Sequence, residues 1–336
     1  MTDAHAALPA KIAAPPRRRS PLRVLGIALL VTAALVPLVG TTFYIRLAIE
    51  ALLVGLLALS IDILLGFAGL LSLGQAAFFG MGAYISALMF LNVTDSFWLV
   101  LATVTAVTTV AAAALGVVAI RTRGVYFALI TLGFGEILYK IVSHTSAIGG
   151  SDGLLGIPVP TIGLGPLQLS LADNIVFFYF VLALVVLVFV GVERLLATPF
   201  GLVLRGLHEN DSRIPYLAYN PFWYRLAAFI LAANVAAIGG AIYPLLRGFV
   251  GPNLFAFELS VKAVVMALVG GIGTLIGALM GGGVITFLES VISTVTTHHS
   301  LAIGALFVAC VLFFPGGLAG AMRDGLAGRS SARRDE

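Results

Sequence analysis

Long apolar runs, and not a two-residue alternation, dominate the pattern of hydrophobic and polar positions along this 336-residue chain. A helix needs about 20 mostly apolar residues to cross the hydrocarbon core of a membrane, with a range of about 17–25. Runs of roughly this length are separated by short polar or glycine-rich breaks. They predict membrane-spanning helices at 24–40, 45–66, 70–91, 97–120, 124–142, 174–192, 224–245, 261–279, 282–297 and 300–314.

The last three runs are short and interrupted by glycine, so the predicted number of spanning helices is eight to ten. Segments of about ten alternating residues, the pattern of membrane β-barrels, do not recur. Composition agrees, because 60% of the residues are hydrophobic and 10% are charged, against about 45–50% and 25% in soluble domains. The predicted fold class is an all-α polytopic membrane protein.

Basic residues are distributed unevenly between the two sides of the membrane that these spans define. With the amino terminus inside, all but four of the 19 lysines and arginines fall in cytoplasmic segments, and the exceptions are Arg46, Lys140, Arg247 and Lys262. Cytoplasmic loops of membrane proteins carry an excess of Lys and Arg. We therefore expect both termini in the cytoplasm, and the net charge of +4 indicates orientation and not nucleic-acid binding.

The chain divides into one membrane domain and two tails. Residues 1–21 are rich in Ala and Pro and end in a basic cluster, which predicts a disordered cytoplasmic tail. Residues 22–320 form the transmembrane domain, and residues 321–336 form a second basic cytoplasmic tail.

Two connecting segments are long enough to carry a function. Residues 143–173 contain no Lys or Arg and are predicted to form an outer loop, whereas 193–223 lie inside. Thr198 and Pro199 are a favourable helix start, because Thr is a good N-cap and Pro fits the first helical position. The apolar stripe that follows comprises Phe200, Val203, Leu204 and Leu207. This spacing predicts a short amphipathic helix, which either contacts a cytoplasmic partner or lies along the membrane interface.

Charge inside a predicted span is costly and indicates function by default, and the candidates are Glu50, Asp62, Glu136, Lys140 and Glu289. Glu136 and Lys140 are spaced for an ion pair along one helix. Glu50 and Glu289 lie near helix ends, where we expect them to reach the interface, and Asp62 is expected to reach the headgroups at the inner end of its span. The set is too scattered to predict a proton relay.

The stretch GLLSLGQAAFFGMGAY (69–84) contains four glycines and one amide side chain in an apolar run. Helix propensity disfavours so many glycines, so they have another role. A second glycine pattern, Gly273, Gly277 and Gly281, recurs every four residues. This is the small-residue stripe that lets membrane helices approach closely, and it predicts helix packing here.

The sequence contains patterns that resemble enzyme motifs, but each lacks a feature that the motif requires. Ser151, in GGSDG, lacks the strand that precedes a hydrolase nucleophile, so no catalytic residue is predicted. His298 and His299 are adjacent and point to different helix faces, so no metal site is predicted. The single cysteine, Cys310, excludes an intramolecular disulfide. The sequence contains no Gly-x4-Gly-Lys-Ser/Thr, and therefore no P-loop for ATP.

Several ordered motifs resemble one family of membrane proteins. They are LLSLGQAAFFGMGAY (70–84), RGVYFALITLGFGEI (123–137), IGGSDGLLGIP (148–158), FGLVLRGLHEND (200–211), ALVGGIGTLIGALMGG (267–282) and the terminal FFPGGLAG (313–320). Together they resemble the inner-membrane permease subunits of branched-chain amino acid ABC importers, of the LivM type. The resemblance spans about residues 22 to 322.

The resemblance implies the ABC importer permease fold and a set of partners. These are a second homologous permease subunit, two cytoplasmic ABC ATPase subunits that bind ATP and Mg, and an extracytoplasmic substrate-binding protein. The chain itself would bind no cofactor and catalyse no reaction. In this family a cytoplasmic helix docks on the ATPase, and the matching positions here are Gly201, Arg205, Glu209, Asn210 and Asp211.

Two departures from the family pattern affect these positions. Leu202 stands where an arginine is common, and LHEND replaces the usual Ile-Arg-Glu-Asx run. Gln75 stands in SLGQ where SLGH is commoner, so a titrating group is absent there.

The implied function is ATP-driven import of branched-chain or similar small amino acids across the bacterial inner membrane. Alternatives are a permease for urea or short amides and an ion-coupled secondary transporter. In a permease, freed backbone carbonyls can line a polar cavity. The residues that we predict to line the translocation pathway are Ser72, Gly74, Gln75, Gly80, Gly82 and Glu136. The other interpretation is that the glycines serve packing alone.

Overall fold

The computed structural model describes residues 40–295, except 165, 166, 212 and 213, and the isolated residues 35, 37, 304 and 317. The predicted spans 24–40 and 300–314 and both tails lie wholly or almost wholly outside this part. Within it, seven helices are long and apolar enough to cross a membrane. They are α2 (Thr42–Asp62) with its π-helical continuation Ile63–Phe67, α3 (Gln75–Asn92), α4 (Phe97–Ala119), α5 (Val125–His144), α6 (Asn174–Leu196), α8 (Pro221–Arg247) and α10 (Ile276–Val295).

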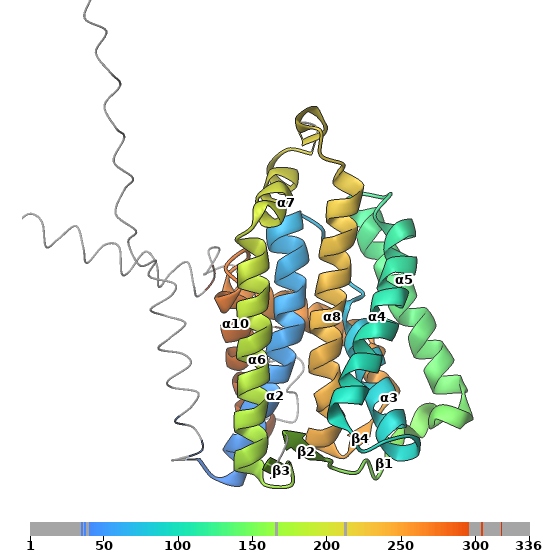
Figure 1. The fold of residues 1–336 in the computed structure, drawn as a ribbon, viewed down its shortest axis with the longest axis vertical. Helices are drawn as coiled ribbons and strands as arrows, with labels where there is room; N and C mark the ends of the chain where they lie inside the picture. Colours follow the sequence, from blue (N-terminus) through green and yellow to red (C-terminus); the bar gives the residue numbers. More distant parts are fainter. Residues whose placement is uncertain are drawn as a thin grey trace, which may run out of the picture.

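Helices α2, α3 and α8 form the centre of the bundle (Figure 1). In each of these helices 67% to 72% of the most apolar 18-residue stretch is buried, whereas the share is 28–33% in α4, α5 and α6. Because lipid is as apolar as the protein interior, the outer helices expose large side chains such as Val110, Leu129 and Leu187 at no cost. The all-α polytopic fold class is confirmed.

Small residues set the spacing of the central helices. A Cβ on Gly82 or Gly240 would overlap the backbone of the helix packed against it, because Gly82 meets Ala237 on α8 and Gly240 meets Phe79 on α3. Such contacts replace hydrophobic burial as the source of packing energy in a membrane.

Two predicted helices are broken in the structure. The span predicted at 70–91 begins only at Gln75, and residues 69–74 are irregular. The run predicted at 261–279 ends as α9 (Phe257–Gly270), and α10 starts after a turn at 271–275. Both breaks coincide with glycines, whose freedom at positive φ allows the chain to leave the helix at Gly69 and at Gly271.

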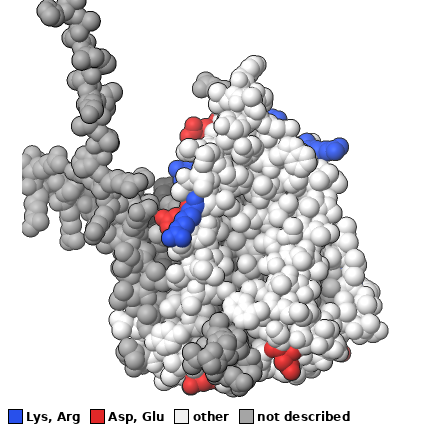
Figure 2. Space-filling view, viewed as in Figure 1, with Lys and Arg blue, Asp and Glu red and all other residues white. Residues whose placement is uncertain are grey.

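Short strands close the end of the bundle opposite α7 (Pro199–Glu209), as Figure 1 shows. β1 (Leu154–Leu155) pairs antiparallel with β4 (Phe249–Val250), so the 143–173 segment is tied to the end of α8. β2 (Thr161–Leu164) and β3 (Leu167–Ser170) form a hairpin. In Figure 2 the visible basic side chains lie towards the α7 end, together with acidic ones, while the strand end of this face shows acidic side chains and no basic ones.

Candidate functional site

Helix α7 follows α6 after a tight turn and lies across one end of the bundle. Gly201 is buried against the backbone of Leu196, where a Cβ would overlap the Leu196 carbonyl group. Val203, Leu204 and Leu207 are buried and Phe200 is half-buried, so the predicted apolar stripe forms one face of the helix, and this face packs on the bundle. Thr198 begins the helix, but its hydroxyl donates to the Leu195 carbonyl (2.6 Å) instead of capping α7.

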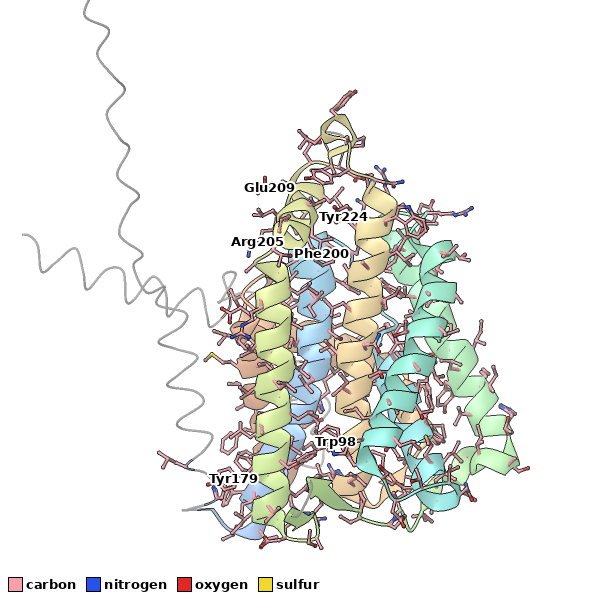
Figure 3. The ribbon with its side chains drawn as sticks, in the orientation of Figure 1. Trp98, Tyr179, Phe200, Arg205, Glu209 and Tyr224 are labelled. Carbon is pink, nitrogen blue, oxygen red and sulfur yellow. The ribbon has the colours of Figure 1, made fainter. Side chains whose placement is uncertain are left out.

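The opposite face of α7 is exposed and charged (Figure 3). Arg205, His208 and Glu209 are all exposed. The guanidinium of Arg205 lies 4.9 Å from the ring centroid of Phe67, at the π-helical end of α2. A Cβ on Gly69 would lie 3.3 Å from His208 Nδ1. The charged face of α7 is therefore accessible to solvent, while Arg205 and His208 contact the segment that follows α2.

Asp211 ties the end of α7 to two other elements. Its carboxylate pairs with Arg225 on α8 and with Arg123 before α5, each at 2.9 Å. Arg225 is nearly buried and Asp211 is partly so, which makes this pair stronger than a solvated one. Asp211 was predicted as a docking residue, whereas the structure gives its carboxylate partners within the chain. Arg225 was not predicted, although an arginine five residues into a spanning helix is the signal that marks it.

Asp62 is fully buried, and the expectation that it reaches the headgroups is wrong. Its Oδ1 accepts the N–H of Gly273 (2.5 Å) and its Oδ2 accepts the N–H of Leu275 (2.8 Å). The turn between α9 and α10 packs across the end of α2 and brings these amides to the carboxylate. Gly66 permits the approach, because a Cβ there would lie 2.5 Å from the Gly273 nitrogen.

The irregular segment before α3 is held by hydroxyl groups. Thr131 Oγ1 accepts the N–H of Leu73, and Ser260 Oγ accepts the N–H of Ala76, each at 3.1 Å. Ser72 and Gln75 are buried, and the Gln75 amide reaches Ser72 Oγ only at 3.5 Å, a weak contact. Among the described residues nothing donates to Gln75 Oε1.

The remaining predicted pathway residues are packed in different ways. Gly74 is buried against the Thr131 backbone, Gly80 against the Phe255 ring and Gly82 against Ala237, so close helix approach accounts for each glycine. Glu136 is half-buried on α5, and no ion pair with Lys140 occurs in the described part of the chain. Their role in a pathway stays a prediction.

The predicted glycine stripe is only partly helical. Gly277 and Gly281 lie on α10, where a Cβ on Gly281 would come within 2.9 Å of the Gly270 nitrogen on α9. Gly273 lies in the preceding turn at a φ of +75°, because its amide is turned towards Asp62. Gly273 is therefore not part of the helical stripe.

Glu50 and Glu289 bridge helices instead of standing alone at the interface. Glu50 on α2 pairs with Arg247 on α8 at 2.5 Å, and Glu289 on α10 pairs with Lys262 on α9. The described residues contain no group of three His, Cys, Asp or Glu side chains that would hold a metal ion.

Comparison with known proteins gives consistent matches. Residues 43–314 match the family described as branched-chain amino acid transport system / permease component. The high-affinity branched-chain amino acid transport system permease protein LivM of Escherichia coli (strain K12) is 29% identical over 92% of this chain and 78% of its own. Permease protein LivH of the same system and strain is 25% identical over 79% of this chain and 90% of its own. No solved structure matches the chain.

Proposed function

The chain belongs to the permease family of branched-chain amino acid transport systems, and from this premise we propose that it is one permease subunit of an ATP-driven importer. Its substrates are branched-chain or similar small amino acids, delivered by an extracytoplasmic binding protein. A second, homologous permease completes the membrane unit, and two cytoplasmic ATPases supply the energy. ATP and Mg bind to those ATPases and not to this chain.

We propose that the α7 end of the bundle faces the cytoplasm of the bacterial cell and that both termini lie there. On the face that Figure 2 shows, the visible basic side chains lie towards this end, which supports the assignment. On this assignment residues 143–173 and the paired strands β1 and β4 face outwards, where the loaded binding protein docks.

The observation that best supports the proposed function is the exposed charged face of α7. Arg205 and Glu209 lie on a helix whose other face is buried in the bundle, so this helix is both accessible and firmly seated. Gly201 lets the first turn of the helix pack against the Leu196 backbone, and Asn210 is its C-cap residue. We assign this face to contact with the ATPase, with Asp211 fixing the orientation of the helix through Arg225.

A continuous set of contacts leads from α7 into the membrane. Arg205 touches Phe67, the chain continues back to Asp62, and Asp62 holds the turn between α9 and α10. A movement of α7 on ATP binding therefore shifts the ends of α2 and α10 together. For ATP to drive transport it has to bind the two conformations with different affinity.

The proposed pathway runs beside the irregular segment before α3. Ser72 and Gln75 supply its polar groups, because the Gln75 carbonyl oxygen has no partner among the described residues. The close contacts of Gly74, Gly80 and Gly82 set the spacing of the helices around it, and Glu136 lies on the half-buried face of α5.

Co-purification tests the assignment of α7. The double variant Arg205→Ala, Glu209→Ala is expected to retain on the order of one tenth of the bound ATPase, since each lost interface contact costs about 1 kcal/mol or more. Amino acid uptake falls with it. The matched control, Asp95→Ala with Lys140→Ala, removes one exposed charge of each sign at the other end and leaves binding unchanged.

Binding of the ATPase that survives the α7 substitutions would overturn the assignment. Uptake by this chain alone, driven by an ion gradient, would overturn the importer proposal itself.

A further inference from the structure

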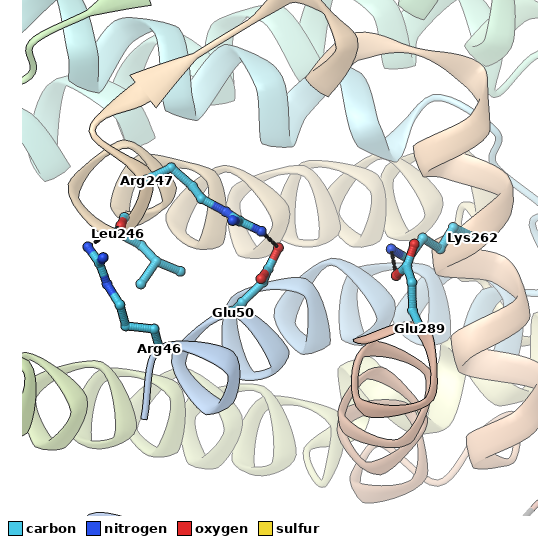
Figure 4. A network of polar contacts seen from close by, with 6 residues as sticks. All are labelled: Arg46, Glu50, Leu246, Arg247, Lys262 and Glu289. Atoms are coloured by element: carbon cyan, nitrogen blue, oxygen red, sulfur yellow. Dashed lines mark hydrogen bonds and ion pairs between the residues drawn. The ribbon is translucent and has the colours of Figure 1, made fainter. Parts of the chain in front are cut away.

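Three of the four basic residues that lie outside the cytoplasmic segments surround one cavity. Arg46, Arg247 and Lys262 line it together with Glu50 and Glu289, and its volume is about 560 Å³ (Figure 4). It opens between α2, α8, α9 and α10, away from α7. Ligand pockets in proteins have volumes of about 300–1,000 Å³, so the space suits a small molecule.

The charges around this cavity are not balanced. Arg247 pairs with Glu50 and Lys262 pairs with Glu289. Arg46 donates one bond to the Leu246 carbonyl (3.0 Å) and pairs with no carboxylate among the described residues. A guanidinium carries five N–H donors in a planar fork that matches a carboxylate. The cavity therefore has one positive group available to an incoming anion.

A second group in the wall is a buried hydroxyl without a partner. Thr286 is 6% exposed, and among the described residues its Oγ1 makes no hydrogen bond. Buried polar groups in native proteins are almost always satisfied, so an unpaired hydroxyl in a cavity wall points to a bound molecule. Phe43, Leu47 and Leu246 supply an apolar part of the same wall.

The cavity wall contains both acidic and basic groups, which indicates a ligand that carries both a positive and a negative charge. A simple anion would lie beside the carboxylates of Glu50 and Glu289, and a simple cation would lie beside Arg46 and its neighbours. A molecule that carries one charge of each sign satisfies both sets of groups, and an apolar side chain would contact Phe43 and Leu47.

We propose that this cavity binds an amino acid as its zwitterion, before the amino acid enters the translocation pathway. The carboxylate contacts Arg46 and the Thr286 hydroxyl. The ammonium group contacts the lone pairs of Glu50 and Glu289 that their ion pairs with Arg247 and Lys262 leave free, and the side chain lies on the apolar wall. The proposal rests on the proposed function, because it assigns a site to the substrate of that importer. A lipid with an ammonium-bearing phosphate headgroup has related chemistry, and the test distinguishes the two.

Photolabelling of the purified full-length chain tests the site without transport. The probe is a leucine analogue with a diazirine in its side chain, added to protein in phosphatidylglycerol nanodiscs. We expect adducts on the peptides that contain Phe43–Leu47 and Thr286–Glu289. Excess leucine removes them, whereas 4-methylpentanoate, which lacks the ammonium group, and isoamylamine, which lacks the carboxylate, do not.

Substitutions define the contacts. Arg46→Gln is expected to reduce labelling about tenfold, the usual effect of losing one charge-assisted hydrogen bond, and Thr286→Val, which keeps the shape, reduces it by a smaller factor. Arg194→Gln removes an exposed arginine from α6 and leaves labelling unchanged, which controls for net charge.

Three results would overturn the proposal. They are labelling elsewhere only, equal competition by the two singly charged analogues, and loss of labelling when phosphatidylethanolamine is added, which would assign the cavity to lipid. None of them bears on ATPase binding by α7, so failure of this site and failure of the importer proposal are distinguishable.

Discussion

Asp62 shows how the meaning of a single charged residue depends on its partners. A carboxylate inside a membrane is costly unless hydrogen bonds or charges compensate it. Here two backbone amides do so, and both come from a turn more than 200 residues away in sequence. The residue pattern marked Asp62 as unusual but could not supply those amides, because only the packed chain places them.

We predict that Asp62→Asn destabilises the protein by about 1–3 kcal/mol, because an amide accepts one backbone N–H and leaves the other buried donor unpaired. Thermal unfolding of the purified chain, followed by tryptophan fluorescence, measures the change. Asp95→Asn is the control, since Asp95 is exposed near the start of α4. Equal melting temperatures for the two variants would show that the carboxylate does not hold the turn.

At the scale of elements, the closest helix contact formed by the glycine stripe joins α9 and α10. Gly281 faces the backbone of α9, whereas a Cβ on Gly283, two residues further along the same helix, would meet no heavy atom within 4 Å. Substitution at Gly281 therefore tests helix packing, whereas substitution at Gly283 on the same helix tests helix propensity alone.

Gly281→Ala is expected to cost about 1–3 kcal/mol, because the added methyl group forces α9 and α10 apart. Gly283→Ala is expected to be neutral or to stabilise by up to about 1 kcal/mol, since alanine is the better helix former. Denaturation of the two variants side by side measures the difference. A similar loss at both positions would contradict the packing role of Gly281.

Helix α7 is the element that its sequence specified best. The four-residue stripe predicted which side chains share the apolar face of the helix, and Pro199 predicted where the helix starts. What the stripe left open was the surface on which the helix lies. The contacts of Arg205 with Phe67 and of Asp211 with Arg225 answer this, and they join segments far apart in the chain.

At the scale of the whole molecule, the arrangement of charge predicts its orientation in the membrane. Ser151 is exposed in the short helix before β1, at the strand end, and Tyr216, which is 90% exposed, lies in the segment between α7 and α8. After Cys310 is replaced by serine, each position receives one cysteine. We expect an impermeant thiol reagent to label Ser151→Cys in intact spheroplasts and Tyr216→Cys only after permeabilisation. The reverse pattern would invert the proposed topology.

The sequence by itself determined the class of the protein, the position of most spanning helices and the amphipathic helix. These depend on local apolar content and helical periodicity, which each segment carries within itself. Only the tertiary structure decided the two helix breaks, the burial of Asp62, the partners of Asp211 and the gathering of Arg46, Arg247 and Lys262 around one cavity. Those features join distant segments, and a hydrogen bond or ion pair between them depends on distances that no local pattern encodes.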